Sequence, residues 1–216
     1  GRPFISCKDS LNNEYLGTDG KRHAIPPTLL ISSIGIMADV TKAVTMDLKG
    51  AGNLLYLVGE FAPTFGGSHF DLVTTDNGSR STVREPVPSV AEKTPKVYAT
   101  LYKAITSGIV RSAHDLSEGG LAVAAAEMCI GGRLGLDLDL ASDDPVRALF
   151  GEATGCLLVE ITLEHAAAFE AQFAGLPCVR LGIVKDAQDL AVSARNHSLF
   201  TIPLPSIIAA WKTPIQ

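Results

Sequence analysis

The sequence lacks the motifs that mark the commonest nucleotide-binding folds. It contains no Walker A sequence, and no Gly-x-Gly-x-x-Gly run opens a strand–helix unit. Internal repeats and low-complexity tracts are absent as well. Any nucleotide site in this chain must therefore be built in another way.

Charged residues are scarce, at 19% of the 216 residues, against about 25% in an average soluble domain. So low a fraction indicates that part of the surface is covered by another chain or domain. The net charge of −5 leaves no basic footprint, so nucleic acid is not an expected partner.

Cysteine is also rare, and none of the four cysteines forms a Cys-x-x-Cys pair or lies at zinc-finger spacing from a histidine. Cys129, Cys156 and Cys178 lie in apolar stretches and are expected to be small buried hydrophobes. This usage favours a reduced, cytoplasmic setting.

No window of 18 apolar residues and no signal peptide occurs, so no membrane association is expected. The chain has no initiator Met and begins abruptly on Gly1, which suggests a piece of a longer protein. Its length fits one domain, or one domain plus part of another.

Hydrophobic periodicity predicts the elements, and the glycine-rich run from Lys49 to Asn53 is the best candidate boundary between two packing units. A turn is expected at 18–21 and an exposed loop at 74–89. Strands are expected at 28–36, 43–48, 54–59, 134–140, 156–161 and 179–184, with a hairpin over 190–202. Helices are expected at 89–106, 122–129, 162–173 and 204–212, and a short one from 142–145. Irregular alternation of strands and helices favours an α+β fold with a mixed or antiparallel sheet.

The segment from Ser112 to Leu121 (Ser-Ala-His-Asp-Leu-Ser-Glu-Gly-Gly-Leu) is the most informative one. It places a carboxylate, a hydroxyl and two glycines between a strand and a helix N-terminus, where free N–H groups favour anions. Asp115 could hold a cation that accompanies a phosphate, and Ser117 could donate to a phosphate oxygen. The alternative is that Ser117 is simply the N-cap of the helix.

Three motifs occur in order along the chain: Lys-Asp-Ser-Leu-Asn-Asn-Glu from Lys8, Gly-Gly-Ser from Gly66, and His-Asp-Leu-Ser-Glu-Gly-Gly-Leu from His114. Together they resemble the C-terminal part of the phosphoribosylformylglycinamidine synthase family, within the aminoimidazole ribonucleotide synthetase superfamily. The resemblance spans nearly the whole chain. The Gly-Gly-Ser run is either a phosphate-facing loop or a plain turn.

The resemblance implies a fold and a domain division. Residues 1–50 would be the tail of an N-terminal α/β domain. Residues 51–216 would form a C-terminal α+β domain, a mixed or antiparallel sheet with helices packed on one face.

The resemblance also implies a ligase of purine biosynthesis. ATP activates the amide oxygen of formylglycinamide ribonucleotide, and glutamine-derived ammonia displaces phosphate to give formylglycinamidine ribonucleotide, ADP and phosphate. The implied partners are the rest of the synthase, which carries the catalytic histidine, and a glutaminase domain or subunit. These 216 residues alone would be inactive.

Residue by residue, the resemblance implies that Asp115 binds Mg²⁺ and that Ser117 contacts the phosphates of ATP or ADP, at a site that in the family's large form is auxiliary rather than catalytic. Gly119 and Gly120 would let the backbone approach these phosphates closely. The resemblance implies a similar contact for Lys8 and Ser10 with substrate or nucleotide. Cys7 stands where the family usually has glycine, and its side chain would narrow the phosphate approach.

Two alternatives remain. The chain could belong to another ATP-using enzyme of the superfamily, a small-molecule kinase or a selenophosphate synthetase. It could instead be a non-catalytic scaffold module, which would bind no ADP in a magnesium-dependent manner.

Overall fold

The computed structural model describes residues 13–25, 31–74 and 85–213. They fall into two compact units, one ending at Ala38 and one beginning at Asp39. Residues 39–49 thus belong with the second unit. The expected domain boundary at residue 50, which concerns the longer protein, stays a prediction.

The first unit contains a hairpin of β1 (Glu14–Leu16) and β2 (Arg22–Ala24), which confirms the turn expected between them. Asp19 accepts a hydrogen bond from the Lys21 N–H at 3.0 Å in this turn. The buried strand expected at 28–36 is wrong in its described part, since no strand is assigned to 31–36 and Ile34 is 96% exposed. An apolar run becomes a buried strand only where a neighbouring strand pairs with it.

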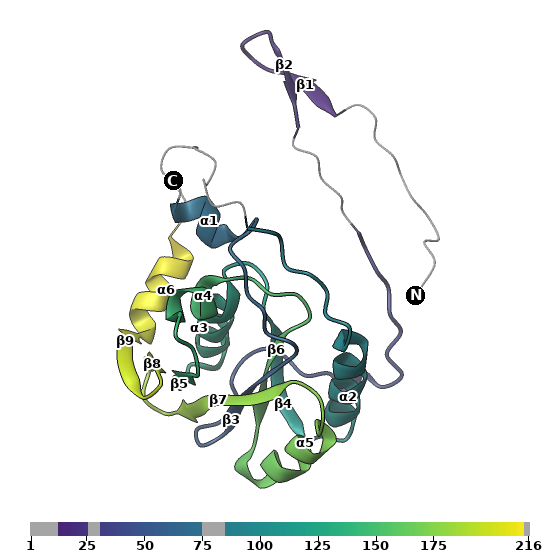
Figure 1. Cartoon of the computed structure of the whole chain (residues 1–216), viewed down its shortest axis with the longest axis vertical. Coiled ribbons are helices and arrows are strands. Elements are labelled where there is room, and N and C mark those ends of the chain that lie inside the picture. The colour runs from purple at the N-terminus through teal and green to yellow at the C-terminus, as the bar shows by residue number, and fades with distance from the viewer. Residues whose placement is uncertain (1–12, 26–30, 75–84, 214–216) are drawn as a thin grey trace. The chain divides into compact units, whose positions relative to one another are not determined.

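The second unit is built on a seven-stranded sheet in the order β4-β6-β3-β7-β5-β8-β9 (Figure 1). Only β5 and β8 pair in parallel, which confirms a mixed sheet in an α+β fold. The strands are β3 (Leu54–Val58), β4 (Val110–Asp115), β5 (Gly135–Leu140), β6 (Leu157–Ile161), β7 (Cys178–Lys185), β8 (Asp189–Ala194) and β9 (His197–Pro203).

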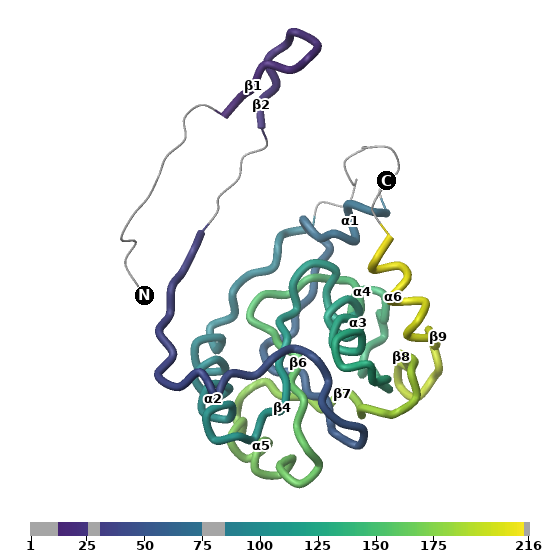
Figure 2. The backbone as a smooth tube through the Cα atoms, turned by 180° about the vertical axis from the view of Figure 1, so that it is seen from behind, coloured from purple at the N-terminus to yellow at the C-terminus, as the bar shows by residue number. Residues whose placement is uncertain are grey.

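Helices cover both faces of this sheet, which corrects the expectation that they lie on one. All five residues of β3 are buried; Leu55 and Leu57 point into one core, and Leu54, Tyr56 and Val58 into the other. The first core packs against α3 (Gly120–Gly132), α4 (Pro145–Phe150) and α6 (Leu204–Lys212). The second packs against α2 (Thr94–Thr106) and α5 (Ala166–Gln172), as Figures 1 and 2 show from opposite sides.

A local signal explains the start of α4. Asp144 accepts the Arg147 N–H at 3.0 Å and Pro145 follows it, so α4 begins as expected. The short 3-10 helix η3 (Leu163–His165) precedes α5, and α6 spans the residues expected for it. Two short elements were not expected, η1 (Val40–Lys42) and α1 (His69–Thr74). Within the described residues, no helix is both long and apolar enough to span a membrane.

The strand expected at 43–48 is wrong, because no strand is assigned there: the Ala113 N–H of β4 donates to the Thr45 carbonyl at 3.2 Å, and the segment then packs on α3. The Leu48 N–H donates to the Met128 carbonyl at 3.2 Å. A Cβ on Gly132 would lie 2.4 Å from the Leu48 carbonyl oxygen, so the glycine permits this close approach.

The fully buried Glu160 stabilises the turn from Lys49 to Asn53, which follows this segment. Its carboxylate accepts hydrogen bonds from the N–H groups of Lys49 and Gly50, the Asn53 amide at 2.6 Å and the Ser112 hydroxyl at 2.8 Å. The same side chain therefore fixes the entry into β3 and the middle of β4.

Candidate functional site

The junction of β4 and α3 confirms that the informative segment runs from a strand into a helix. β4 ends at Asp115 and α3 begins at Gly120. Gly119 and Gly120 have φ of 80° and 66°, in the left-handed region that favours glycine. A Cβ on Gly120 would also lie 2.4 Å from the Gly151 carbonyl oxygen.

A cavity of about 740 Å³ opens beside this junction. Among the expected site residues, Asp115, Ser117 and Gly119 line it. Gly120 does not line it and is buried in the contact with Gly151. Lys8, Ser10 and Cys7 lie outside the described residues. The rest of the lining comes from α1, from β4 and the loop after it, from α3 and from the end of α4: His69, Phe70, Val73, Thr74, His114, Glu118, Val123, Glu127 and Phe150.

Ser117 does not cap α3 with its side chain. The N-cap is Gly119, which has no side-chain cap, and the Ser117 hydroxyl donates to the Asp115 carboxylate. The capping alternative is therefore wrong: α3 begins at Gly120, two residues later than a Ser117 cap requires, and the Gly120 N–H donates to the Ser117 carbonyl, not to its hydroxyl, at 3.1 Å.

The hydrogen bond from Ser117 lowers the pKa of Asp115 below its ordinary value, outweighing the opposite effect of partial burial, and His114 adds to the lowering. Asp115 is thus ionised at neutral pH and open to the cavity. The described residues contain no group of three or more His, Cys, Asp or Glu side chains able to hold a metal. A divalent ion here would take one protein carboxylate and complete its shell with water and ligand oxygens, which is the usual arrangement for Mg²⁺ bound with phosphates.

His114 joins Asp115 to α3. Its Nε2 lies 2.7 Å from Oε2 of Glu127, and its Nδ1 lies 3.3 Å from Oδ1 of Asp115. Sequence reasoning missed Glu127, because nothing local connects it to a histidine on the preceding strand. Because the imidazole contacts both carboxylates, it links Asp115 to Glu127 of α3 at one side of the cavity.

Glu152 is a second residue that the sequence did not reveal. Its Oε1 accepts hydrogen bonds from the backbone N–H of Gly119 at 3.0 Å and of His69 at 2.8 Å. One carboxylate oxygen thus links the starts of α1 and α3.

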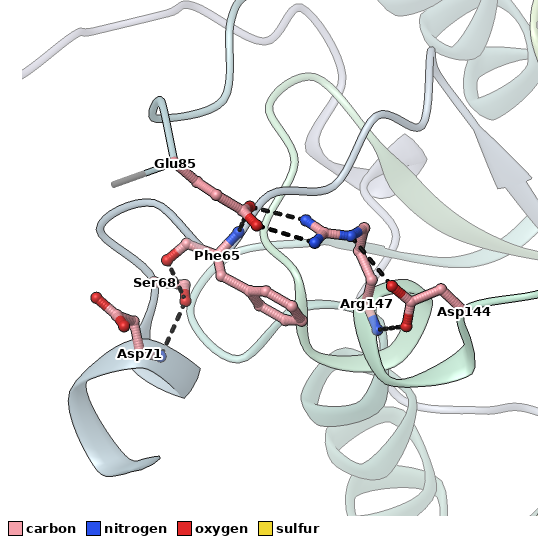
Figure 3. A network of polar contacts seen from close by, with 6 residues as sticks. All are labelled: Phe65, Ser68, Asp71, Glu85, Asp144 and Arg147. Atoms are coloured by element: carbon pink, nitrogen blue, oxygen red, sulfur yellow. Dashed lines mark hydrogen bonds and ion pairs between the residues drawn. The ribbon is translucent and has the colours of Figure 1, made fainter. Parts of the chain in front are cut away.

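The Gly66 to Ser68 run is a turn whose hydroxyl is used within the protein. The buried Ser68 hydroxyl donates to the Phe65 carbonyl at 2.9 Å and accepts the Asp71 N–H at 3.1 Å, as Figure 3 shows. This arrangement starts α1 and favours the plain-turn alternative.

The same turn is braced by an ion pair (Figure 3). Both terminal nitrogens of Arg147 donate to the Glu85 carboxylate, at 2.7 and 2.9 Å, and the Phe65 N–H donates to it at 2.9 Å. The guanidinium lies 4.6 Å from the centre of the Phe65 ring. Phe65 stacks on Phe70, and Phe70 on Phe150, with ring centres 4.8 and 5.5 Å apart, so an aromatic wall borders the cavity.

We expect this brace to weaken in acid. The hydrogen bonds from Arg147, followed by that from Phe65, lower the pKa of Glu85 to about 2. Its contribution to stability is therefore present above the ordinary glutamate pKa of about 4.3 and is lost as pH falls from there towards 2. Urea unfolding at pH 6 and pH 3 should show a smaller fall in stability for Glu85→Gln than for the wild type. An equal fall in both would contradict this assignment.

The cysteines carry no reactive thiol among the described residues. Burial raises the pKa of Cys129 to about 12 and that of Cys156 and Cys178 to about 11. Cys129 and Cys156 are buried as expected, and Cys178 is half-buried.

Comparison with known proteins gives a consistent family. Residues 50–195 match the model of the AIR synthase related protein, C-terminal domain. The chain is 35% identical over 228 residues to the phosphoribosylformylglycinamidine synthase subunit PurL of Synechocystis sp., covering 99% of this chain and 28% of the relative. The same subunit from Deinococcus radiodurans is 35% identical over 223 residues, with 99% and 29% covered. The chain therefore spans less than a third of the length of these relatives.

Solved structures share the fold. Thermotoga maritima PurL complexed with FGAR aligns with a TM-score of 0.64 and 21% identity, covering 78% of this chain and 30% of that one. PurL complexed with ATP gives 0.61 and 17%, with 78% and 27% covered. The hydrogenase maturation protein HypE in complex with ATP gives 0.53 and 17%, with 78% and 56% covered.

Proposed function

Because the chain belongs to the family of AIR synthase related proteins, in which it matches the C-terminal domain, we propose that it is part of the synthetase component of a phosphoribosylformylglycinamidine synthase. The reaction would convert formylglycinamide ribonucleotide, ATP and glutamine-derived ammonia to formylglycinamidine ribonucleotide, ADP and phosphate. The support is the name shared by the curated relatives that match 99% of this chain. The cytoplasm is the setting we propose.

The observation that carries the local role is the cavity in which Asp115 and Ser117 lie together beside the Phe70–Phe150 wall. Ser117 donates to Asp115 in this structure, and its hydroxyl could turn to a phosphate oxygen once a cation occupies the carboxylate. A bound Mg²⁺ would neutralise phosphate charge. The aromatic side chains offer an apolar surface on which a purine could pack.

The remaining functional groups belong to proposed partners. The catalytic histidine would be supplied by the rest of the synthase, and ammonia by a glutaminase domain or subunit. The direct test is formylglycinamide ribonucleotide-dependent ADP release by the full-length protein supplied with ammonium. Release that instead depends on selenide or on a phosphoryl acceptor would favour another enzyme of the superfamily.

The nucleotide role is tested by calorimetric titration of ADP into the full-length protein, with Mg²⁺ and with excess chelator. We expect Asp115→Asn to weaken magnesium-dependent ADP binding by about tenfold, or about 1.4 kcal/mol, since the ion would lose a charged protein ligand. Glu118→Gln removes an exposed carboxylate of the same cavity and serves as the matched control. Binding that is unaffected by Asp115→Asn and by the chelator would favour the scaffold module.

A further inference from the structure

Two loops that border the cavity are hydrogen-bonded to the same side chain, which belongs to a third loop. His69 opens α1 directly after the Gly-Gly-Ser turn, and Gly119 precedes α3 directly after the loop of Asp115 and Ser117. Both residues line the cavity. Their N–H groups converge on Oε1 of Glu152, at 2.8 and 3.0 Å.

The backbone of Glu152 is itself fixed. Its N–H donates to the Thr64 carbonyl at 2.9 Å, and its carbonyl accepts the Thr64 N–H at 3.0 Å, which forms an isolated antiparallel bridge. Gly151, just before it, packs so closely on Gly120 that a Cβ there would lie 2.4 Å from the Gly151 oxygen. The carboxylate therefore reaches both loops from a backbone that is bridged to Thr64, five residues before His69, and packed on Gly120, directly after Gly119.

This arrangement changes how an anion would be recognised in the cavity. A free N–H at a helix N-terminus is a ready donor to phosphate, but the Gly119 N–H already donates to a protein carboxylate. Of the phosphate contacts expected at this junction, the Ser117 hydroxyl and a cation on Asp115 remain.

We propose that Glu152 is a positioning residue that clamps the His69 and Gly119 loops together and thereby places Asp115 and Ser117 for the magnesium-bound phosphates of the nucleotide. This inference rests on the proposed function, whereas the clamp itself is a property of the protein without ligand. Glutamine at this position keeps a side-chain oxygen that can accept both N–H groups. Alanine provides no side-chain acceptor for either N–H group.

The experiment compares Glu152→Ala, Glu152→Gln and the control Glu164→Ala, which removes an exposed carboxylate of η3 outside the cavity lining, in the full-length protein. Hydrogen–deuterium exchange of the amides of His69 and Gly119 should accelerate about tenfold in Glu152→Ala alone. Magnesium-dependent ADP binding should weaken about tenfold in Glu152→Ala and stay within about threefold of the wild type in the other two variants. Circular dichroism at the same temperature confirms that each variant is folded.

A change of ADP affinity in the opposite direction would overturn the proposal. If Glu152 acts only as a negative charge near phosphate, both of its variants bind ADP more tightly than the wild type. Unchanged exchange in Glu152→Ala, or acceleration at only one of the two amides, would remove the clamp. Faster exchange with unchanged ADP binding would remove the positioning role. If the wild type binds no ADP, the proposed nucleotide role fails, and the exchange rates still decide whether the clamp exists.

Discussion

Replacing Glu160 by alanine is expected to lower the free energy of unfolding by about 3–5 kcal/mol. The reason is that four donors lose their acceptor at once, in the backbone of Lys49 and Gly50 and the side chains of Asn53 and Ser112. A buried donor such as the Ser112 hydroxyl costs about 1–3 kcal/mol when it is left without a partner, and the other three donors, whose hydrogen bonds are part-buried, cost less because water can reach them. The removed side chain also leaves a void, because Glu160 is fully buried.

Urea unfolding followed by circular dichroism measures this effect. Ser112→Ala removes one donor and leaves the others in place, so we expect it to lose about 1 kcal/mol. Glu118→Ala changes an exposed carboxylate and should lie within about 0.5 kcal/mol of the wild type. A loss below that of Ser112→Ala for the Glu160 variant would show that water replaces the carboxylate without penalty.

The second large effect is expected for Gly120→Ala, at about 2–4 kcal/mol of lost stability. Two causes add. A left-handed residue other than glycine costs about 1–2 kcal/mol, and the new Cβ would lie 2.4 Å from the oxygen of Gly151 and 3.0 Å from that of Leu149. Both are backbone atoms, so neither moves aside without disturbing the start of α3 or the end of α4.

Gly108 provides the matched control for this substitution. Its φ of 80° is also left-handed, but an added Cβ would meet nothing within 4 Å. Gly108→Ala should therefore lose only the conformational part, about 1–2 kcal/mol. Equal unfolding midpoints for the two variants would show that the contact with Gly151 relaxes freely.

Elements with a local cause were predictable. The alternation of Leu and Asp defines β5, and Asp144 with Pro145 defines the start of α4. The apolar runs at 28–36 and 43–48 were misleading, because a strand needs a partner that only the tertiary structure supplies. The covering of both sheet faces by helices could be predicted from β3, since its five consecutive apolar residues indicate burial on two sides.

The site residues show the same difference between those with a local sequence pattern and those without one. Asp115, Ser117 and Gly119 lie within five positions of one another, and the cavity does bring them together. Glu127 and Glu152 reach the same place from α3 and from the loop after α4, and no local pattern announces them. The alternative of a side-chain cap by Ser117 is wrong because Gly119, with its left-handed φ of 80°, delays the start of α3 to Gly120.

The position of β3 has a consequence for how the chain folds. This strand comes first among those of its sheet, yet Leu54 pairs with Ile161 on one side and Ile183 on the other, both more than a hundred residues later. During synthesis, its apolar residues leave the ribosome long before either neighbour exists. Sheet closure then waits on loop entropy over most of the second unit, so we expect slow folding with high relative contact order. Until β7 appears, one edge of β3 has no pairing strand, and its apolar residues are exposed to aggregation.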